Sequence, residues 1–178
     1  LPQVIMASRF TKQKDQPTLI QAMRILKAQQ VQTKLSLAGL GKTRLLQQSQ
    51  KVSVELGLAE QIEFLGHVAN MPELLAKHQI FVLSTHYEGM PLALIEAMAS
   101  GCACIGTDVV GVREVIAHGV TGLLVPENDA QAMADAIAML LKDPEKAENL
   151  GTAARAAVQQ HFTLQVMNDN YTRLLLQL

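Results

Sequence analysis

Two cationic side chains stand close together near the start of the chain. Arg9 and Lys14 are five residues apart, and they follow an apolar run over residues 4–8 that predicts a β-strand. An arginine guanidinium can hold a phosphate through two parallel hydrogen bonds, and a lysine adds a compact positive charge. At the carboxyl end of a strand this pair could bind a diphosphate. The simpler alternative, two solvated loop charges, stays open at this point.

Two glutamates further along the chain have a spacing that suits a long ligand. Glu88 comes after the apolar run 80–84, and Glu96 lies in a helix predicted over 91–100. Their carboxylates would be about 10–15 Å apart, which exceeds the roughly 5–10 Å of a hydrolytic acid/base pair. They could instead accept hydrogen bonds from hydroxyl groups at two ends of a ligand, while the helix start favours an anion between them. A nucleotide-diphosphate sugar has this composition.

Glu96 stands in an unusually apolar part of that predicted helix. Its neighbours in sequence are Ile95 and Ala97. We therefore expect its carboxylate to be buried or partnered, with an ordinary surface glutamate as the alternative.

Residues 39–43, Gly-Leu-Gly-Lys-Thr, look at first like the end of a phosphate-binding P-loop. That motif needs a further glycine at position 36, which is Ser36, and a dinucleotide-binding loop needs one at position 44, which is Arg44. A working NTPase is therefore not the favoured interpretation. We interpret the stretch as a tight turn into a helix, with a loop beside a bound nucleotide as the alternative.

The elements that must position these residues alternate along the chain. Short apolar runs typical of strands occupy residues 4–8, 35–38, 62–65, 80–84, 103–106 and 123–125. Helical spacing of apolar residues occurs at 18–29, 43–56, 71–77, 91–100, 112–117, 130–141, 144–161 and 164–177. The alternation predicts an α/β fold: a doubly wound six-stranded parallel sheet with helices on both faces and extra C-terminal helices. We expect the three closing helices to pack on its outside.

This fold predicts where a ligand would bind. In an open parallel sheet the site lies at the carboxyl ends of the strands, near the point where the strand order reverses. The loops to inspect are therefore 8–15, 39–43, 66–70, 85–90, 106–111 and 126–129.

Composition narrows the function classes. The chain has 178 residues, 49% of them hydrophobic, and a formal net charge of -1, which suits one folded domain and disfavours a nucleic-acid binder. We find no apolar stretch of about 18 residues that could span a membrane. Cys102 and Cys104 are interpreted as small buried hydrophobes of a cytoplasmic protein, and the five histidines show no metal-ligand spacing. Because the sequence begins inside an apolar run, we expect a domain of a longer protein.

Several of these stretches together resemble one protein family. Glu88 and Glu96, followed by Ala-Met-Ala-Ser-Gly at 97–101, resemble the E-x7-E signature of the retaining group 1 (family 4) glycosyltransferases of GT-B architecture. Similar stretches lie at 4–15, 35–41, 62–66, 111–116 and 119–125, so the resemblance covers nearly the whole chain. Two departures stand out: Gly111 is followed by Val112 where the family often has a second glycine, and Met90 stands where an aromatic residue is common.

The resemblance implies a function for the chain. Residues 1–178 would be the donor-binding domain, a Rossmann-like half of the GT-B fold, of an enzyme that transfers a sugar from a nucleotide-diphosphate sugar to a glycan or lipid-linked acceptor. An N-terminal acceptor-binding domain would be missing, so the isolated domain would be inactive. The family needs no metal and no further cofactor. The alternative is a non-catalytic nucleotide-sugar-binding module of the same fold.

The resemblance also implies roles for single residues. Arg9, Lys14 and Glu88 would be catalytic: the two cations would hold the diphosphate and Glu88 would contact hydroxyls of the sugar. The full set of implied donor-binding residues is Arg9, Lys14, Gly39, Gly41, Gly66, His67, Val68, Glu88, Gly89, Met90, Pro91, Leu92 and Glu96. Within it, Glu96 would accept from the ribose and the loop after residue 65 would flank the base. The final helix would contact the missing domain, through which peripheral membrane association at the inner face remains an alternative.

Overall fold

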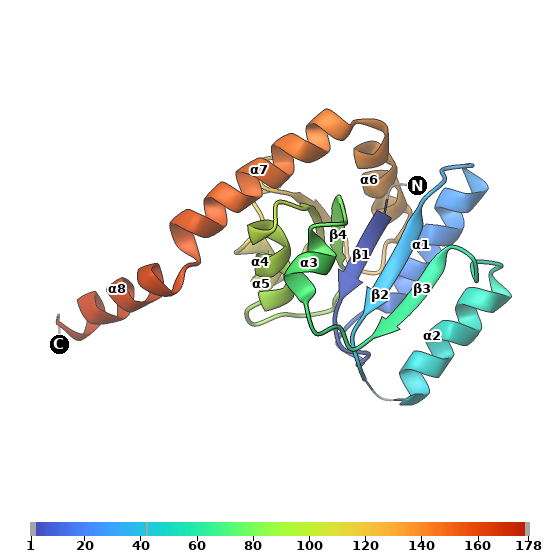
Figure 1. Cartoon of the computed structure of the whole chain (residues 1–178), viewed down its shortest axis with the longest axis horizontal. Coiled ribbons are helices and arrows are strands. Elements are labelled where there is room, and N and C mark those ends of the chain that lie inside the picture. Colours follow the sequence, from blue (N-terminus) through green and yellow to red (C-terminus); the bar gives the residue numbers. More distant parts are fainter. Residues whose placement is uncertain (1–2, 42, 177–178) are drawn as a thin grey trace.

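Six parallel strands form the centre of the molecule. The computed structural model describes residues 3–41 and 43–176. The strands are β1 (Gln3–Ala7), β2 (Lys34–Ala38), β3 (Ile62–Gly66), β4 (Ile80–Leu83), β5 (Ala103–Thr107) and β6 (Leu123–Val125). Their order is β3-β2-β1-β4-β5-β6, and every pair is parallel (Figure 1). The predicted doubly wound sheet is confirmed, and its strand order reverses between β1 and β4.

The strands are apolar because both faces of the sheet are covered. All four residues of β4 and all five of β5 are buried. A strand that is packed on both faces has no polar side to alternate with, which is why these segments read as continuous apolar runs.

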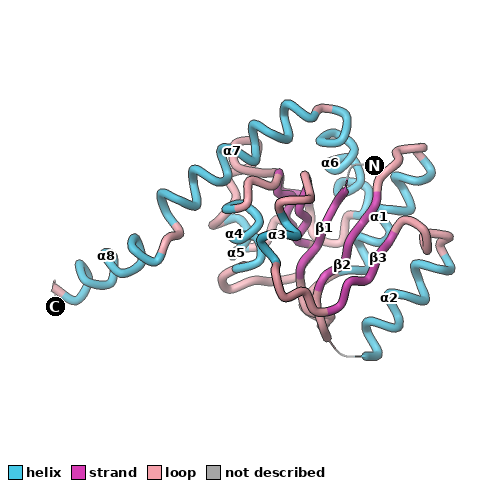
Figure 2. The backbone as a smooth tube through the Cα atoms, in the orientation of Figure 1, coloured by secondary structure: helices cyan, strands magenta, loops and turns pink. Residues whose placement is uncertain are grey.

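Helices α1 (Gln16–Ala28), α2 (Thr43–Glu55), α3 (Met71–Leu75), α4 (Leu92–Ala99) and α5 (Val110–Arg113) connect the strands. Helix α1 packs against α2, whereas α4 packs against α3. Right-handed connections, the rule for parallel strands, place the connecting helices of the two halves of such a sheet on opposite faces. The tube in Figure 2 shows the loops after β1, β2 and β3 meeting at one end of the sheet.

Most predicted helix boundaries differ from the structure by one or two residues, and two of the helices are worth describing. Helix α1 begins at Gln16 and not at residue 18, because the Asp15 carboxylate accepts from the Thr18 N–H at 3.2 Å and caps the helix. The helix predicted at 112–117 is a single turn at Val110–Arg113.

The closing helices are α6 (Ala130–Lys142), α7 (Pro144–His161) and α8 (Leu164–Leu175). Helix α6 packs on α1, and α7 packs on α4 and β5, as predicted. The prediction is wrong for α8, which has no buried residue over the part of it that the structure describes and extends away from the sheet (Figure 1). Two leucines at its C-terminal end, Leu174 and Leu175, are 57% and 67% exposed, and Leu176 directly after it is 82% exposed.

Candidate functional site

Four of the predicted loops meet at the carboxyl ends of the strands. The loop after β1 is joined to the loop after β2 by the Phe10 N–H, which donates to the Leu40 carbonyl at 3.0 Å. The Gly39 N–H donates to the Gly66 carbonyl at 2.7 Å and so joins β2 to β3. On the other side Lys14 forms an antiparallel bridge with Thr85, in the loop after β4. The loops at 8–15, 39–41, 66–70 and 85–90 therefore form one continuous rim.

The two glycines after β2 let the neighbouring loop approach. A Cβ on Gly39, whose φ is +137°, would lie 2.0 Å from the Ser8 carbonyl oxygen. A Cβ on Gly41 would lie 2.5 Å from the backbone and Cβ of Phe10. Backbone atoms at these distances cannot give way, so both positions need glycine. The tight turn predicted here is present, and its glycines support the loop that carries Arg9. Lys42 lies outside the described residues.

Lys14 and Glu88 form an ion pair between the loops after β1 and β4. The Lys14 Nζ donates to Glu88 Oε1, and the two side chains are 15% and 6% exposed. The other carboxylate oxygen, Oε2, lies 3.3 Å from the Gln13 Nε2. Two of the three residues predicted to be catalytic are thus brought into direct contact.

Arg9 completes the cationic part of the rim. Its backbone carbonyl accepts from Gln16 Nε2 at 3.1 Å, and the same amide nitrogen lies 3.1 Å from Ser8 Oγ. Gln16 is only 3% exposed, so this anchor is protected from water. The Arg9 side chain itself is exposed and pairs with no side chain among residues 3–41 and 43–176. A fixed backbone with a free guanidinium leaves Arg9 available to an anion.

The expectation that Glu96 is buried or partnered is wrong. Glu96 is exposed, because α4 buries Leu94, Ile95, Ala97 and Met98 and leaves the stripe of Leu92 and Glu96 facing outward. An apolar neighbourhood in sequence does not bury a residue on the outer stripe of a helix. Glu96 is nevertheless accessible to a ligand hydroxyl.

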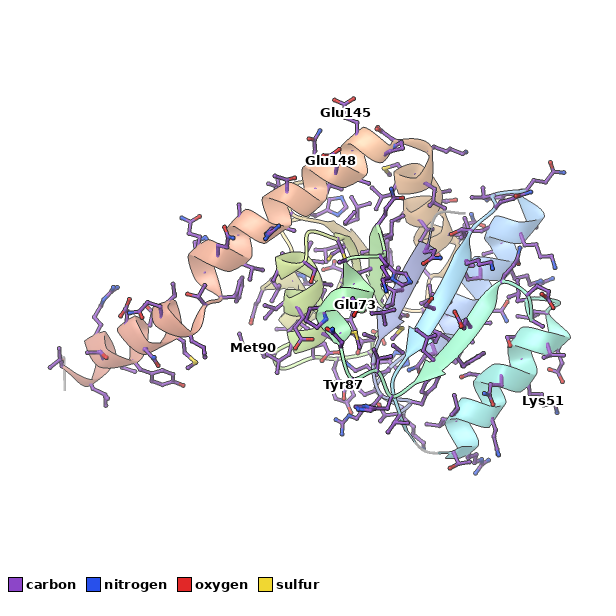
Figure 3. The ribbon with its side chains drawn as sticks, in the orientation of Figure 1. Lys51, Glu73, Tyr87, Met90, Glu145 and Glu148 are labelled. Carbon is purple, nitrogen blue, oxygen red and sulfur yellow. The ribbon has the colours of Figure 1, made fainter. Side chains whose placement is uncertain are left out.

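The start of α4 carries the remaining residues predicted in this loop. Pro91 is buried at the cap position, whereas Met90 and Leu92 are 60% and 63% exposed. Among residues 3–41 and 43–176 no side chain caps α4, so its first N–H groups receive no side-chain acceptor there. A Cβ on Gly89 would meet nothing within 4 Å. Figure 3 shows Tyr87 and Met90 at the end of the sheet toward which the strands run, far from Glu145 and Glu148.

The predicted segment Gly66, His67 and Val68 lies in the last residue of β3 and the loop after it, at the end of the rim beyond the β2 turn. Gly66 has a φ of +64°, which suits glycine, and its carbonyl accepts from the β2 turn. His67 is exposed and Val68 is half-buried against the core. The structure places all three on the same edge of the sheet as Arg9 and Lys14.

Sequence reasoning missed several polar residues that shape the site. Thr107, at the end of β5, donates to the Thr85 carbonyl at 2.7 Å and accepts from the Thr85 N–H at 3.1 Å. His86 Nδ1 lies 2.6 Å from Glu127 Oε1 and so joins the loops after β4 and β6. Gln13, the residue before Lys14, contacts the Tyr87 carbonyl and the Glu88 carboxylate. Only their positions directly after strands could have marked them, because their types and spacing match no motif.

Two cavities border the rim. The larger, about 480 Å³, is lined mainly by apolar side chains from the start of α4 and the junction of α7 and α8, among them Met90, Leu92, Ile95, Phe162, Tyr171 and Leu174. The smaller, about 260 Å³, lies between the loop after β1 and α2, and includes Lys14, Asp15, Ser49 and His86. The larger cavity is not at the Lys14–Glu88 pair, and its apolar lining does not suit a diphosphate.

The described part of the chain has neither a metal-binding cluster nor a helix that could span a membrane, and its two cysteines are buried. In residues 3–41 and 43–176 we find no group of three or more His, Cys, Asp or Glu side chains that could hold a metal ion. No helix in this part of the chain has the length and apolar character needed to cross a membrane. Burial raises the pKa of the Cys102 thiol to about 11, and burial together with nearby Cys102 raises the pKa of Cys104 well above its ordinary value.

With this geometry established, the chain can be compared with known proteins. Residues 1–157 match the profile of the family described as glycosyl transferases group 1, and the chain belongs to this family. The resemblance inferred from Glu88, Glu96 and the surrounding stretches is thereby confirmed.

Two curated relatives of the chain are each more than twice its length. It is 36% identical over 170 residues to N-acetyl-alpha-D-glucosaminyl L-malate synthase of Bacillus anthracis, covering 94% of this chain and 43% of that protein. It is 32% identical over 182 residues to the putative colanic acid biosynthesis glycosyltransferase WcaL of Salmonella typhimurium, covering 97% of this chain and 44% of that protein. The chain therefore spans less than half of these relatives.

Solved structures agree with the fold. Anabaena Alr3699/HepE in complex with UDP and glucose superposes with a TM-score of 0.91 at 25% identity, over 99% of this chain and 48% of that one. The C-terminal domain of a group 1 family protein, LpcC of Francisella tularensis, superposes with a TM-score of 0.83 at 25% identity, over 92% of this chain and 87% of that domain. The chain thus corresponds to a C-terminal domain of its group 1 relatives.

Proposed function

We propose that this chain is the donor-binding half of a retaining glycosyltransferase, which transfers a sugar from a nucleotide-diphosphate sugar to a glycan or lipid-linked acceptor. Family membership supports the reaction class. The related HepE structures contain UDP, UDP with glucose, or UDP-glucose, which supports a nucleotide-sugar donor. The relative WcaL, with its name in colanic acid biosynthesis, supports a role in polysaccharide assembly.

The observation that carries this proposal is the meeting of Lys14 with Glu88 on the rim whose loop after β1 also carries the exposed Arg9. Cations and a carboxylate on one rim suit a ligand that has an anionic centre and a hydroxylated group next to it. A lysine ammonium has three N–H donors, so Lys14 can hold Glu88 and a phosphate oxygen together. The N–H groups at the uncapped start of α4 add positive potential on the same edge.

In the proposed reaction these residues act mainly on the leaving group. The bond between the anomeric carbon and the diphosphate oxygen breaks, and its electron pair stays on the diphosphate. Arg9 and Lys14 stabilise that charge, which is the interaction that strengthens in the transition state. We propose that these two cations replace a metal ion in this role. The acceptor oxygen forms the new bond on the same face of the sugar, and its proton passes to the departing diphosphate oxygen.

The other predicted residues orient the donor. Glu88 accepts hydrogen bonds from the sugar hydroxyls, and the exposed Glu96 accepts from the ribose. The backbone N–H groups around Gly89 and Met90 contact the sugar or the phosphate. Gly66, His67 and Val68 flank the base. Holding the donor in one geometry lowers the entropic part of the barrier.

The rest of the reaction needs a second domain. We propose that an N-terminal domain supplies the acceptor site, and that the exposed leucines of α8 pack against it. The isolated chain then binds donor weakly and does not turn it over. A cytoplasmic location, with peripheral membrane association through the N-terminal domain as the alternative, belongs to the same proposal.

One observation favours a second candidate function. Lys14 and Glu88 pair directly, with side chains that are 15% and 6% exposed, as they would in a purely structural ion pair. A non-catalytic module that binds nucleotide-sugars through the rest of the rim fits the same geometry.

Titration calorimetry on the chain tests the proposal. The panel contains UDP-glucose, UDP-N-acetylglucosamine, GDP-mannose, UDP, GDP and ATP, each with and without Mg²⁺. We expect one nucleotide-sugar and its own nucleoside diphosphate, with either uridine or guanosine as the nucleoside, to bind both with and without Mg²⁺. Tight binding of ATP with Mg²⁺ only, with no response to the others, contradicts the proposal. In the protein joined to its N-terminal half, loss of transfer in Glu88→Ala and Lys14→Ala, with the fold intact, supports catalysis; unchanged transfer favours the module.

A further inference from the structure

The backbone of Gln13 is held firmly against the loop after β4. Its carbonyl accepts from the His86 N–H at 2.9 Å and from the Thr85 hydroxyl at 3.1 Å. Directly after Gln13, Lys14 bridges to Thr85, and the Asp15 N–H donates to the Ser84 carbonyl at 3.0 Å. Gln13 therefore starts from a fixed position, which limits where its side chain can reach.

Its side-chain amide reaches two acceptors in that loop. Nε2 donates to the Tyr87 carbonyl at 2.7 Å and lies 3.3 Å from Glu88 Oε2. Both neighbours can only accept, so the nitrogen and not the oxygen of the amide must face them, and its two N–H groups are both used. Gln13 thus contacts both the backbone before Glu88 and the carboxylate itself.

The two oxygens of the Glu88 carboxylate have different partners. Oε1 accepts from Lys14, and Oε2 faces Gln13. The Glu88 side chain is 6% exposed, so water can replace a lost donor only poorly, and a buried carboxylate oxygen without a partner is costly. Gln13 and Lys14, which are consecutive in sequence, together fix the plane of this carboxylate.

We propose that Gln13 is a positioning residue that keeps Glu88 oriented toward the donor sugar while Lys14 serves the diphosphate. The expected effect on donor binding rests on the proposed function, whereas the contacts of Gln13 with Tyr87 and Glu88 do not depend on it. A bound diphosphate also accepts from the Lys14 ammonium, which then divides its N–H groups between the phosphate and Glu88. The Gln13 amide is neutral and is also tied to the Tyr87 carbonyl, so its hold on Glu88 persists.

Gln13→Met tests this role, since methionine has nearly the same length and no donor. Gln13→Leu is a second neutral variant that cannot donate to the Tyr87 carbonyl. Lys12→Met is the matched control, because Lys12 is the preceding residue, is exposed and makes no described contact with Glu88. Thermal unfolding first establishes that each variant folds.

The first readout compares a nucleotide-sugar with its own diphosphate. We use whichever pair binds best in the panel: UDP-glucose or UDP-N-acetylglucosamine with UDP, or GDP-mannose with GDP. We expect both Gln13 variants to weaken nucleotide-sugar binding about tenfold or more, the worth of a hydrogen bond to a charged group, and to change diphosphate binding less than about twofold. Equal loss for both ligands, or loss for neither, overturns the inference. Lys12→Met changes neither.

The second readout needs no ligand and therefore separates this inference from the proposed function. Scalar couplings in the NMR spectra of the free chain report the side-chain rotamers of Glu88. We expect a single rotamer in the native chain and in Lys12→Met, and averaging over several in Gln13→Met. If Glu88 keeps one rotamer without the Gln13 amide, the inference is wrong. If no nucleotide binds but the rotamers behave as stated, the proposed function fails and the positioning role stands.

Discussion

Lys14 and Glu88, 74 residues apart in sequence, meet as an ion pair that joins the loops at the point where the strand order of the sheet reverses. With side chains 15% and 6% exposed, neither charge is well hydrated. The contact that joins the loops after β1 and β4 also fixes the positions of the Lys14 ammonium and the Glu88 carboxylate, the two groups proposed to bind the donor.

We expect removal of either charge to destabilise the chain by more than removal of both. Lys14→Met leaves the buried Glu88 carboxylate without its cation, and Glu88→Gln leaves the Lys14 ammonium without its anion. The double variant leaves neither charge unpaired. Urea unfolding of the four proteins gives a double-mutant cycle, in which we predict a coupling of about 1–3 kcal/mol. The exposed pair of Lys77 and Glu73 is the control, with a coupling close to zero. Additive effects for Lys14 and Glu88 would show that the pair contributes nothing.

Gly111 packs against the backbone carbonyls of Glu88 and Gly89. A Cβ at this position would lie 2.4 Å from the Glu88 carbonyl oxygen and 2.7 Å from that of Gly89. Gly111→Ala should therefore displace the loop and cost about 1–3 kcal/mol of the free energy of unfolding. Gly89→Ala, where an added Cβ meets nothing within 4 Å, should change it by less than about 0.5 kcal/mol. Chemical denaturation measures both, and equal effects would contradict the packing explanation.

The sheet was predictable because each of its strands leaves a recognisable apolar run in the sequence. Strands that are buried on both faces leave continuous apolar runs, such as that at Ile80–Leu83, and helix caps leave polar residues between runs. The boundary error at α1 came from counting apolar residues and overlooking the Asp15 cap, which extends the helix back to Gln16.

The site was predictable only in part. Residue types and spacing selected Arg9, Lys14 and Glu88, and the structure brings Lys14 and Glu88 into contact. Sequence neighbours misled the expectation for Glu96, because burial on a helix depends on the stripe and not on the adjacent residues. The role of Gln13 could not be predicted, since its partners are contributed by a loop more than 70 residues away.

The thiol of Cys102 should make stability depend on pH in alkaline solution. Burial raises its pKa from 9.0 to about 11, so the folded chain retains a proton that the unfolded chain loses. The stabilising contribution is fully present below pH 9 and is lost as pH rises toward about 11. Urea unfolding of the native chain and Cys102→Ala across this range should show their difference shrinking with pH. A constant difference would mean that the thiol does not titrate differently in the two states.

Helix α8 should contribute little to the stability of the domain. None of the residues of α8 that the structure describes is buried. A chain that ends after Thr163 keeps Phe162, which packs on the core, and should unfold within about 0.5 kcal/mol of the full chain. Limited proteolysis should cut α8 before any other helix. A markedly less stable truncated chain would show that α8 packs on this domain in solution.

The most direct test of the central claim is NMR mapping of the rim with the nucleoside diphosphate, UDP or GDP, that binds best. The account predicts that backbone amide resonances shift around Arg9, Lys14, Gly66 and Gly89, and that those of Gly119 and Gly151 stay in place. It also predicts that Lys14→Ala abolishes the shifts. Shifts confined to the apolar cavity beside α8, or shifts that survive Lys14→Ala unchanged, would contradict a diphosphate site on this rim.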